Sequence, residues 1–340
     1  MNRRIFTLFL GVLSCALIPA PCRAWNSTGH ELVAQIALDQ LSPADRNTIV
    51  AVLMHHPRLT GDLLMGLAFG EDPARAIFLR AATWPDMVRY PMNPLSRTEN
   101  HPTWHYVDYP YELDGVHGTP VVEQWDGKSP PANLLQAMAK ARKELADPAT
   151  PLDRKAIDLC WVMHLTGDIH QPLHAVSEFS KQYPTGDQGG NLQILHNPGD
   201  ILLDVPTINL HTLWDDIEGL SLDPDVIRQI ADRIEQEHPP DQLKELAANT
   251  DVAAWAKESL ELARTKVYLN GTLAHATRDA VMMNIATGPP LPDGYEKDAV
   301  ATADTRIALG GYRLAVGLEE IAKDLEEMPS TTSPTTAPAR

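Results

Sequence analysis

The chain has 340 residues and an apolar fraction of 44%, which is enough for one large domain or two small ones with a substantial core. It carries 28 basic and 45 acidic residues, for a formal net charge of −17. This balance excludes a broad basic surface as the main source of affinity for nucleic acid. If a polyanion is the substrate, something other than lysine and arginine must neutralise its charge locally.

Residues 1–24 are typical of an export signal. Two arginines precede an apolar stretch over residues 5–20, and Cys-Arg-Ala supplies a small-x-small cleavage site before Trp25. The stretch is short for a membrane span and is interrupted by prolines, so a membrane anchor is the weaker alternative. Cleavage would leave Cys160 as the only cysteine, so the mature chain would have no internal disulfide. We therefore expect a secreted or periplasmic protein.

Two helices are predicted at the start of the mature chain. Helical spacing of apolar residues covers 31–41, and Ser42 followed by proline predicts the cap of a second helix that reaches Leu53. A freed α-amino group at Trp25 would be a candidate metal ligand. His30 by itself is more typical of a solvated residue at a helix start than of a ligand.

Asp86 follows an apolar helix and a Trp-Pro step. The proline predicts a break in the helix, which would allow the aspartate to point inward. In isolation, a helix-capping aspartate is the favoured interpretation. Arg89 lies three residues later and could share the same face.

Residues 103–110 predict a short extended segment with alternating faces. His105 would face one side, whereas Tyr106 and Asp108 would face the other. The next residues, 110–133, are rich in proline and glycine and are expected to form a loop.

The highest density of metal-ligand residue types lies at the end of an apolar helix. The run 156–164 is typical of a core helix, and His164 and Asp168 are spaced i, i+4, which places them on one face. Pro172 forces the chain to leave the helix, so His174 would approach from a different direction. Buried imidazoles and a carboxylate are costly to leave unpaired, and metal ligation is the economical explanation.

The second half of the chain contains a second pair of the same metal-ligand residue types. Paired glycines before Asn191 predict a tight turn whose backbone closely approaches another group, and residues 192–195 are predicted to form a short strand. His211 and Asp215 form a second pair at i, i+4. Residues 329–340 have the composition of a disordered tail. Helices are expected near 133–146, 224–236, 252–270 and 300–327.

These patterns predict an all-α protein: a single, mostly helical domain with a short β-hairpin or loop excursions. Nitrogen and oxygen ligands without thiolate favour zinc over manganese or iron. Nine groups are too many for one tetrahedral ion, but with a bridging carboxylate they suit three ions that keep open positions for water. The candidate ligands are Trp25, His30, Asp86, His105, His164, Asp168, His174, His211 and Asp215.

Taken together, the motifs resemble those of the S1/P1 nuclease family, whose fold is related to that of zinc-dependent phospholipase C. The resemblance implies one helical catalytic domain over residues 25–328 and a trinuclear zinc cluster in a cleft. The motifs that carry it are the Trp25…Gly29-His30 start, Trp84-Pro-Asp86, Trp104-His105-Tyr, His164-x3-Asp168-x-His170-Gln-Pro-Leu-His174, Asp187-x-Gly-Gly-Asn191 and Asn209-Leu-His211-x2-Trp-Asp215.

The resemblance also implies a role for each residue. The first zinc would take Asp86, His105, His164 and Asp168. The second would take His174, His211 and Asp215. The third would take the Trp25 amino and carbonyl groups with His30 and share Asp168. Arg89 would bind the phosphate and act in catalysis with Asp86 and Asp168. Tyr106 and Asp108 would hold a nucleobase, and Asn191 would also contact substrate, whereas His170 has no ligand role.

The implied activity is hydrolysis of single-stranded DNA and RNA to 5′-phosphate products. Zinc-activated hydroxide would attack phosphorus, and 3′-nucleotides would also be substrates. We expect a monomer that does not act on membranes.

Two alternatives are open. A zinc-dependent phospholipase C would use the same metals and would show exposed apolar residues around its cleft. A non-catalytic exported zinc-binding protein would show closed coordination. The Gly-Gly-Asn and Asn-Leu-His-x2-Trp-Asp motifs favour the nuclease.

Overall fold

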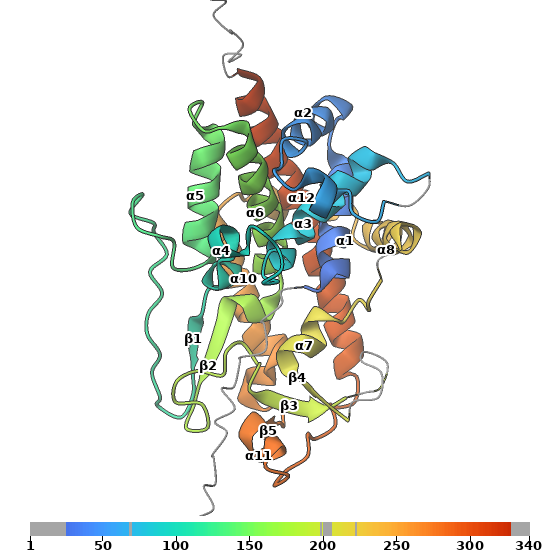
Figure 1. The fold of residues 1–340 in the computed structure, drawn as a ribbon. Helices are drawn as coiled ribbons and strands as arrows, with labels where there is room; N and C mark the ends of the chain where they lie inside the picture. The colour runs from blue at the N-terminus through green and yellow to red at the C-terminus, as the bar shows by residue number, and fades with distance from the viewer. Residues whose placement is uncertain (1–24, 68–69, 198, 200–205, 222, 328–340) are drawn as a thin grey trace, which may run out of the picture.

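The computed structural model describes residues 25–67, 70–197, 199, 206–221 and 223–327. The predicted signal peptide over residues 1–24 and the predicted tail over 329–340 lie outside the described residues. The described chain is mostly helical with two small sheets (Figure 1). The all-α prediction is therefore confirmed. None of the helices in these ranges is long and apolar enough to cross a membrane.

Helix α6 (Leu152–His170) is the central element. Its residues from Lys155 to His170 are all buried, as expected for a helix that is packed on every side. Figure 1 shows α6 running through the middle of the helical part of the molecule. It packs mainly against α2 (Pro43–Leu53), α3 (Pro73–Met87), α5 (Leu134–Ala146) and α12 (Tyr295–Glu327), and also against α1 (Ser27–Gln40).

The remaining helical segments are short or lie at the periphery of this bundle. The predicted helices of the second half are confirmed, although the last begins earlier than expected, at Tyr295. The segments are η1 (Leu59–Leu63), α4 (Ser96–Glu99), η2 (Pro102–His105), η3 (Pro172–Ala175), α7 (Leu210–Asp215), α8 (Pro224–Glu237), α9 (Pro240–Ala247), α10 (Val252–Leu262), η4 (Ala263–Val267), η5 (Leu269–Gly271) and α11 (Arg278–Met282).

The strands gather at one end of the molecule together with α7 and α11 (Figure 1). β1 (Tyr109–Glu112) pairs in parallel with β2 (Val176–Phe179). A second, antiparallel sheet has the order β4-β3-β5, and its middle strand confirms the strand predicted at 192–195. These three strands are β3 (Gln193–His196), β4 (Thr207–Asn209) and β5 (Ala276–Thr277).

Two local predictions were wrong. Helix α3 continues through Pro85 to Met87, because a proline removes only one backbone donor, and the helix as a whole packs against α6. Residues 103–110 are not continuously extended: η2 occupies 102–105, since Pro102 favours the first position of a helical turn, and the strand begins only at Tyr109. The parallel pairing of β1 with β2 was also not foreseen, because it joins segments far apart in the sequence.

Two hydrophobic clusters meet where α6 ends. The larger surrounds α6 and includes Ile169. The smaller lies under the strands and includes Leu173 and Trp214. The chain passes from one cluster to the other between Ile169 and Leu173, so residues of this connection lie deep in the molecule.

Candidate metal centre

Three groups of buried or partly buried side chains could each hold a metal ion, and within each group the ligand atoms lie within 4.8 Å of one another. Two groups share His164, so they form one connected cluster. The groups are His30, His164 and Asp168; Asp86, His105 and His164; and His174, His211 and Asp215.

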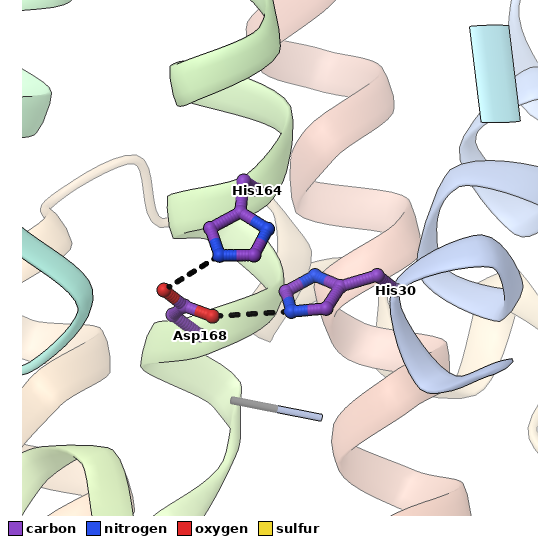
Figure 2. Close-up of side chains that lie close together, drawn as sticks. All are labelled: His30, His164 and Asp168. Atoms are coloured by element: carbon purple, nitrogen blue, oxygen red, sulfur yellow. Dashed lines mark ion pairs between the residues drawn. The ribbon is translucent and has the colours of Figure 1, made fainter. Parts of the chain in front are cut away.

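Asp168 lies at the centre of the connected cluster. Its Oδ1 is 3.2 Å from His30 Nε2, and its Oδ2 is 3.1 Å from His105 Nδ1 and 3.3 Å from His164 Nε2. Figure 2 shows the carboxylate between the His164 and His30 side chains, with one oxygen toward each. The i, i+4 prediction for this helix is therefore confirmed, and a third imidazole reaches the same carboxylate.

A glycine allows α1 and α6 to approach at this point. A Cβ added at Gly167 would lie 2.6 Å from Nδ1 of His30, whose ring stacks on His164 with centroids 4.0 Å apart. A side chain at position 167 would therefore push His30 away from Asp168. His30 is buried, so the interpretation of an isolated, solvated helix-start histidine was wrong.

Backbone carbonyls orient three of the imidazoles. Nδ1 of His164 lies 2.7 Å from the carbonyl oxygen of Ala82, and Nδ1 of His174 lies 2.6 Å from that of His105. His211 Nδ1 is likewise 2.6 Å from the carbonyl oxygen of Gly189. A carbonyl can only accept, so each Nδ1 carries the proton and each Nε2 has a lone pair for a metal.

The glycine turn confirms the expected close approach of backbone. Gly189 has φ +60°, and a Cβ there would lie 2.6 Å from the carbonyl oxygen of Leu173. The buried carboxylate of Asp187 closes the turn by accepting from Gly190 N–H at 2.8 Å and from the Tyr268 hydroxyl at 2.8 Å. Burial raises the pKa of Asp187 to about 7. Asn191 donates from Nδ2 to the carbonyl oxygen of Gln188.

The third group lies on η3 and α7. The Nε2 atoms of His174 and His211 are 3.1 Å apart, and His211 Nε2 is 3.5 Å from Asp215 Oδ2. The other carboxylate oxygen of Asp215 accepts from Nε2 of Gln171 at 2.6 Å. Gln171 is fully buried and was missed as a functional residue, although its place between the candidate ligands Asp168 and His174 was a signal.

The segment that begins at Trp25 is held beside this third group. Trp25 is buried, and the next residue, Asn26, donates its backbone N–H to the carbonyl oxygen of Asp215 at 3.1 Å. The Asn26 amide also donates to Asp216 Oδ1 at 2.9 Å and to the carbonyl oxygen of Gly219 at 2.7 Å. The loop after Asp215 therefore fixes the position of the residue that follows Trp25.

The predicted substrate residues lie at more exposed positions. Arg89 Nε is 3.2 Å from Asp86 Oδ1, so these two share a face as expected, and both side chains are partly exposed. Asp86 belongs to α3 itself and does not cap it. Tyr106 is half-buried and Asp108 is exposed, between η2 and β1.

The electrostatics of the connected cluster favour a bound cation. Burial lowers the pKa of His30 to about 4 and lowers those of His105 and His164 well below the ordinary value, so all three rings are neutral. Burial, with the charge of Asp86, raises the pKa of Asp168 well above its ordinary value. Neutral imidazoles are the form that ligates metal, and a nearby cation would return Asp168 to the carboxylate.

Buried polar atoms that make no hydrogen bond support the same conclusion, although some of them lie at ion-pair distance from one another. Buried atoms without a hydrogen-bond partner in the described chain include both ring nitrogens of His30, Nε2 of His105, and one carboxylate oxygen each of Asp86 and Asp168. Such groups are costly to bury unless something else, such as a metal ion, satisfies them. The nitrogen and oxygen donor set fits zinc, and the one cysteine in these ranges, Cys160, belongs to none of the groups.

Two other acidic groups in the described chain are less suited to a metal. Glu237, His238 and Asp304 lie close together, but Arg233 already pairs with Asp304 at 2.7 Å and supplies the cation. Asp39, Asp232 and Glu235 lack a histidine, and Arg228 pairs with Asp39.

Comparison with known proteins identifies the family. A model of the S1/P1 Nuclease family matches residues 25–323. "Endonuclease 3" from Arabidopsis thaliana is 26% identical over 329 residues, covering 94% of this chain and 95% of the relative. "Nuclease P1" from Penicillium citrinum is 24% identical over 313 residues, covering 87% and 97%. "Nuclease S1" from Aspergillus oryzae is 25% identical over 199 residues, covering 56% and 53%. The chain therefore belongs to the S1/P1 nuclease family and is an endonuclease of that type.

Proposed function

We propose that this endonuclease hydrolyses single-stranded DNA and RNA to 5′-phosphate products and also removes the phosphate of 3′-nucleotides. S1/P1 nucleases are zinc enzymes, and the chain has the donor groups for such an enzyme. The observation that carries the proposal is the buried carboxylate of Asp168, which three imidazoles from three different elements approach within 3.3 Å.

Three zinc ions per chain are proposed. The nine donor residues would be Asp86, His105, His164 and Asp168 for the first ion; His174, His211 and Asp215 for the second; and Trp25, through its amino and carbonyl groups, with His30 for the third, with Asp168 shared. Zinc, when bound, supplies a Lewis acid for phosphoryl groups and lowers the pKa of water. The burial of Trp25 beside Asp215 through Asn26 supports a role for the processed terminus.

Arg89 is the residue best suited to bind the scissile phosphate. Its guanidinium is partly exposed and pairs with Asp86, whose other neighbours are His105 and His164. A guanidinium binds phosphate oxygens through two parallel hydrogen bonds, and the pairing with Asp86 restricts its orientation. Asp86, Arg89 and Asp168 would therefore form the catalytic set.

Substrate selection would fall to residues outside the cluster. The half-buried ring of Tyr106 would stack on a nucleobase, and Asp108 and Asn191 would contact the same nucleotide. Stacking on an aromatic ring requires a base that is not already stacked in a duplex, which favours single strands.

Export would complete the site. We propose cleavage before Trp25, which would free its amino group for the third ion, followed by secretion or periplasmic retention of a monomer. The family match begins at this same residue.

Substitution of the central carboxylate and its helix neighbour tests the proposal. Asp168→Ala and His164→Ala should each lose zinc and cleavage of single-stranded DNA, RNA and a 3′-mononucleotide. His238→Ala, in the acidic group occupied by Arg233, is the matched control and should keep both properties. Retained zinc and full activity in Asp168→Ala or His164→Ala would refute the assignment.

One observation favours the phospholipase alternative. Tyr90 and Met92, which follow Arg89, are 58% and 96% exposed, and a membrane-acting enzyme would show such residues around its cleft. Family membership favours the nuclease, and hydrolysis of phosphatidylcholine by the same preparation decides between the two substrates. The family assignment leaves the non-catalytic alternative without support.

A further inference from the structure

A groove of about 790 Å³ lies on the α5 side of η2. It is lined by residues of α4, η2 and α5, by a turn over residues 125–131 and by the connection from α5 to α6, and the lining includes the carboxylates of Glu99, Glu144 and Asp147. This turn belongs to the long loop between β1 and α5, which runs from the strand end of the molecule up to α5 (Figure 1). We name it the lysine–tryptophan groove after five of its lining residues: Trp104, Trp125, Lys128, Lys140 and Lys143.

The turn over residues 125–131 is preorganised. The Asp126 carboxylate accepts from the backbone N–H groups of Lys128 and Ser129, both at 2.8 Å, and from the Ser129 hydroxyl. The indole N–H of Trp125 donates to the carbonyl oxygen of Ser129 at 2.7 Å, and that of Trp104 donates to Pro131 at 3.1 Å. Both indole N–H groups are thus satisfied within the protein, and Trp125, the more exposed of the two, can use its ring face. A preformed turn reduces the entropy lost on binding.

Cations lie over these ring faces. Lys143 Nζ is 5.4 Å from the centroid of the Trp125 ring, and Lys140 Nζ is 5.9 Å from that of Trp104. Lys140 has a carboxylate partner, since it pairs with Glu144 at 2.6 Å. Lys128 and Lys143 have no ion-pair partner in the described chain. In a protein with a net charge of −17, two such lysines beside a partly exposed indole are suited to an anion that carries flat rings.

The groove adjoins the metal centre. Trp104 is the residue before His105, and the ring of Trp161 lies between their side chains. The Trp161 centroid is 4.9 Å from that of Trp104 and 5.3 Å from that of His105. Trp161 and His105 are fully buried, so the groove and the metal centre lie close together through the core.

We propose that the lysine–tryptophan groove is an accessory site for single-stranded nucleic acid, separate from the cleavage site. One base of the strand stacks on Trp125, and Lys128 and Lys143 bind phosphates on either side of it. An indole face accepts any base, so the site adds affinity for longer strands without adding sequence preference. The inference rests on the proposed single-strand activity and extends it to strand length.

The test compares a dinucleotide with a single strand of about 12 nucleotides as substrates of the zinc-loaded enzyme. Trp125→Ala should lower kcat/KM for the longer strand roughly 5- to 150-fold through KM and leave the dinucleotide unchanged. Trp125→Phe, which keeps a stacking face, should restore most of the loss. The double variant Lys128→Ala/Lys143→Ala should reduce the slope of log KM against log salt by about 1.4. Lys244→Ala, which removes one exposed lysine on α9, is the control for loss of a surface lysine and should leave kcat/KM unchanged for both substrates.

Equal effects on both substrates, or none on the longer strand, in Trp125→Ala and the lysine variant would overturn the proposal. The lysine variant changes only surface charge and decides the question if Trp125→Ala fails to fold. If the unaltered enzyme cleaves the dinucleotide, the proposed nuclease function holds even when the variants show that the groove does not bind the strand. If neither substrate is cleaved, the proposed function fails, and the fluorescence anisotropy of a labelled strand on the same proteins then decides whether the groove binds it.

Discussion

Replacing Gly167 by alanine tests whether the contact between α1 and α6 is required for the proposed third ion. The new Cβ would lie 2.6 Å from Nδ1 and 3.0 Å from Cε1 of His30. The His30 ring cannot easily retreat, because it is buried and stacks on His164 at 4.0 Å. Either the helices separate or His30 turns away from Asp168.

Two opposing effects set the change in the free energy of unfolding of Gly167→Ala. Alanine favours a helix over glycine by about 1 kcal/mol. Overpacking in a buried contact costs about 1–3 kcal/mol. The metal-free variant should therefore be unchanged or destabilised by up to about 2 kcal/mol, which corresponds to a decrease in Tm of at most about 8 °C. The displaced His30 should also cost about one zinc ion per chain.

Gly317→Ala is the matched control. Gly317 is also a buried helical glycine, but an added Cβ would meet only the end of the flexible Arg142 side chain at 3.4 Å. The free energy of unfolding of this variant should increase by up to about 1 kcal/mol, and the variant should keep all of its zinc. The assays are metal analysis by mass spectrometry and thermal unfolding with and without chelator. If Gly167→Ala behaves like Gly317→Ala in both assays, the reasoning is refuted.

Two further predictions concern Gln171, which supports the site, and the buried His56. Gln171→Met removes the hydrogen bond to Asp215, so competition with a chelator should show one zinc bound about 10- to 100-fold more weakly, and unchanged affinity would contradict this role. Burial lowers the pKa of His56 from 6.5 to about 4. The unfolded chain therefore binds a proton at this residue below pH 6.5, whereas the folded protein does not. As the pH falls from 6.5 to 4, the free energy of unfolding should decrease by up to about 3 kcal/mol because of His56. Denaturant unfolding of His56→Gln across this range should show a weaker loss of stability than the unaltered protein; parallel curves would count against it.

Local patterns were sufficient for much of the site. The pairs His164/Asp168 and His211/Asp215 could be predicted because residues four apart in a helix share a face whatever surrounds it. The paired glycines predicted a turn with close backbone, since few other residues adopt a positive φ. The helices followed from apolar periodicity and capping residues. Which metal and how many ions these groups bind stay predictions.

Neighbouring elements decided what local patterns could not. Pro85 predicted a break, yet α3 continues through it beside α6. His30 looked like a solvated residue because nothing within α1 shows that Gly167 leaves space for its ring. The place of Gln171 between two candidate ligands did not show which group it contacts; the structure places its amide 2.6 Å from Asp215.

The sequence by itself determined the helical class, the family and the types of donor available. Only the tertiary structure decided which donors meet, that Asp168 is the carboxylate shared by three imidazoles, and that a second, tryptophan-lined groove lies beside the cluster. The physical reason is the distance along the sequence over which each effect acts. Periodicity, capping and turns depend on residues a few positions apart, whereas convergence depends on how side chains from distant elements fit together in a close-packed interior.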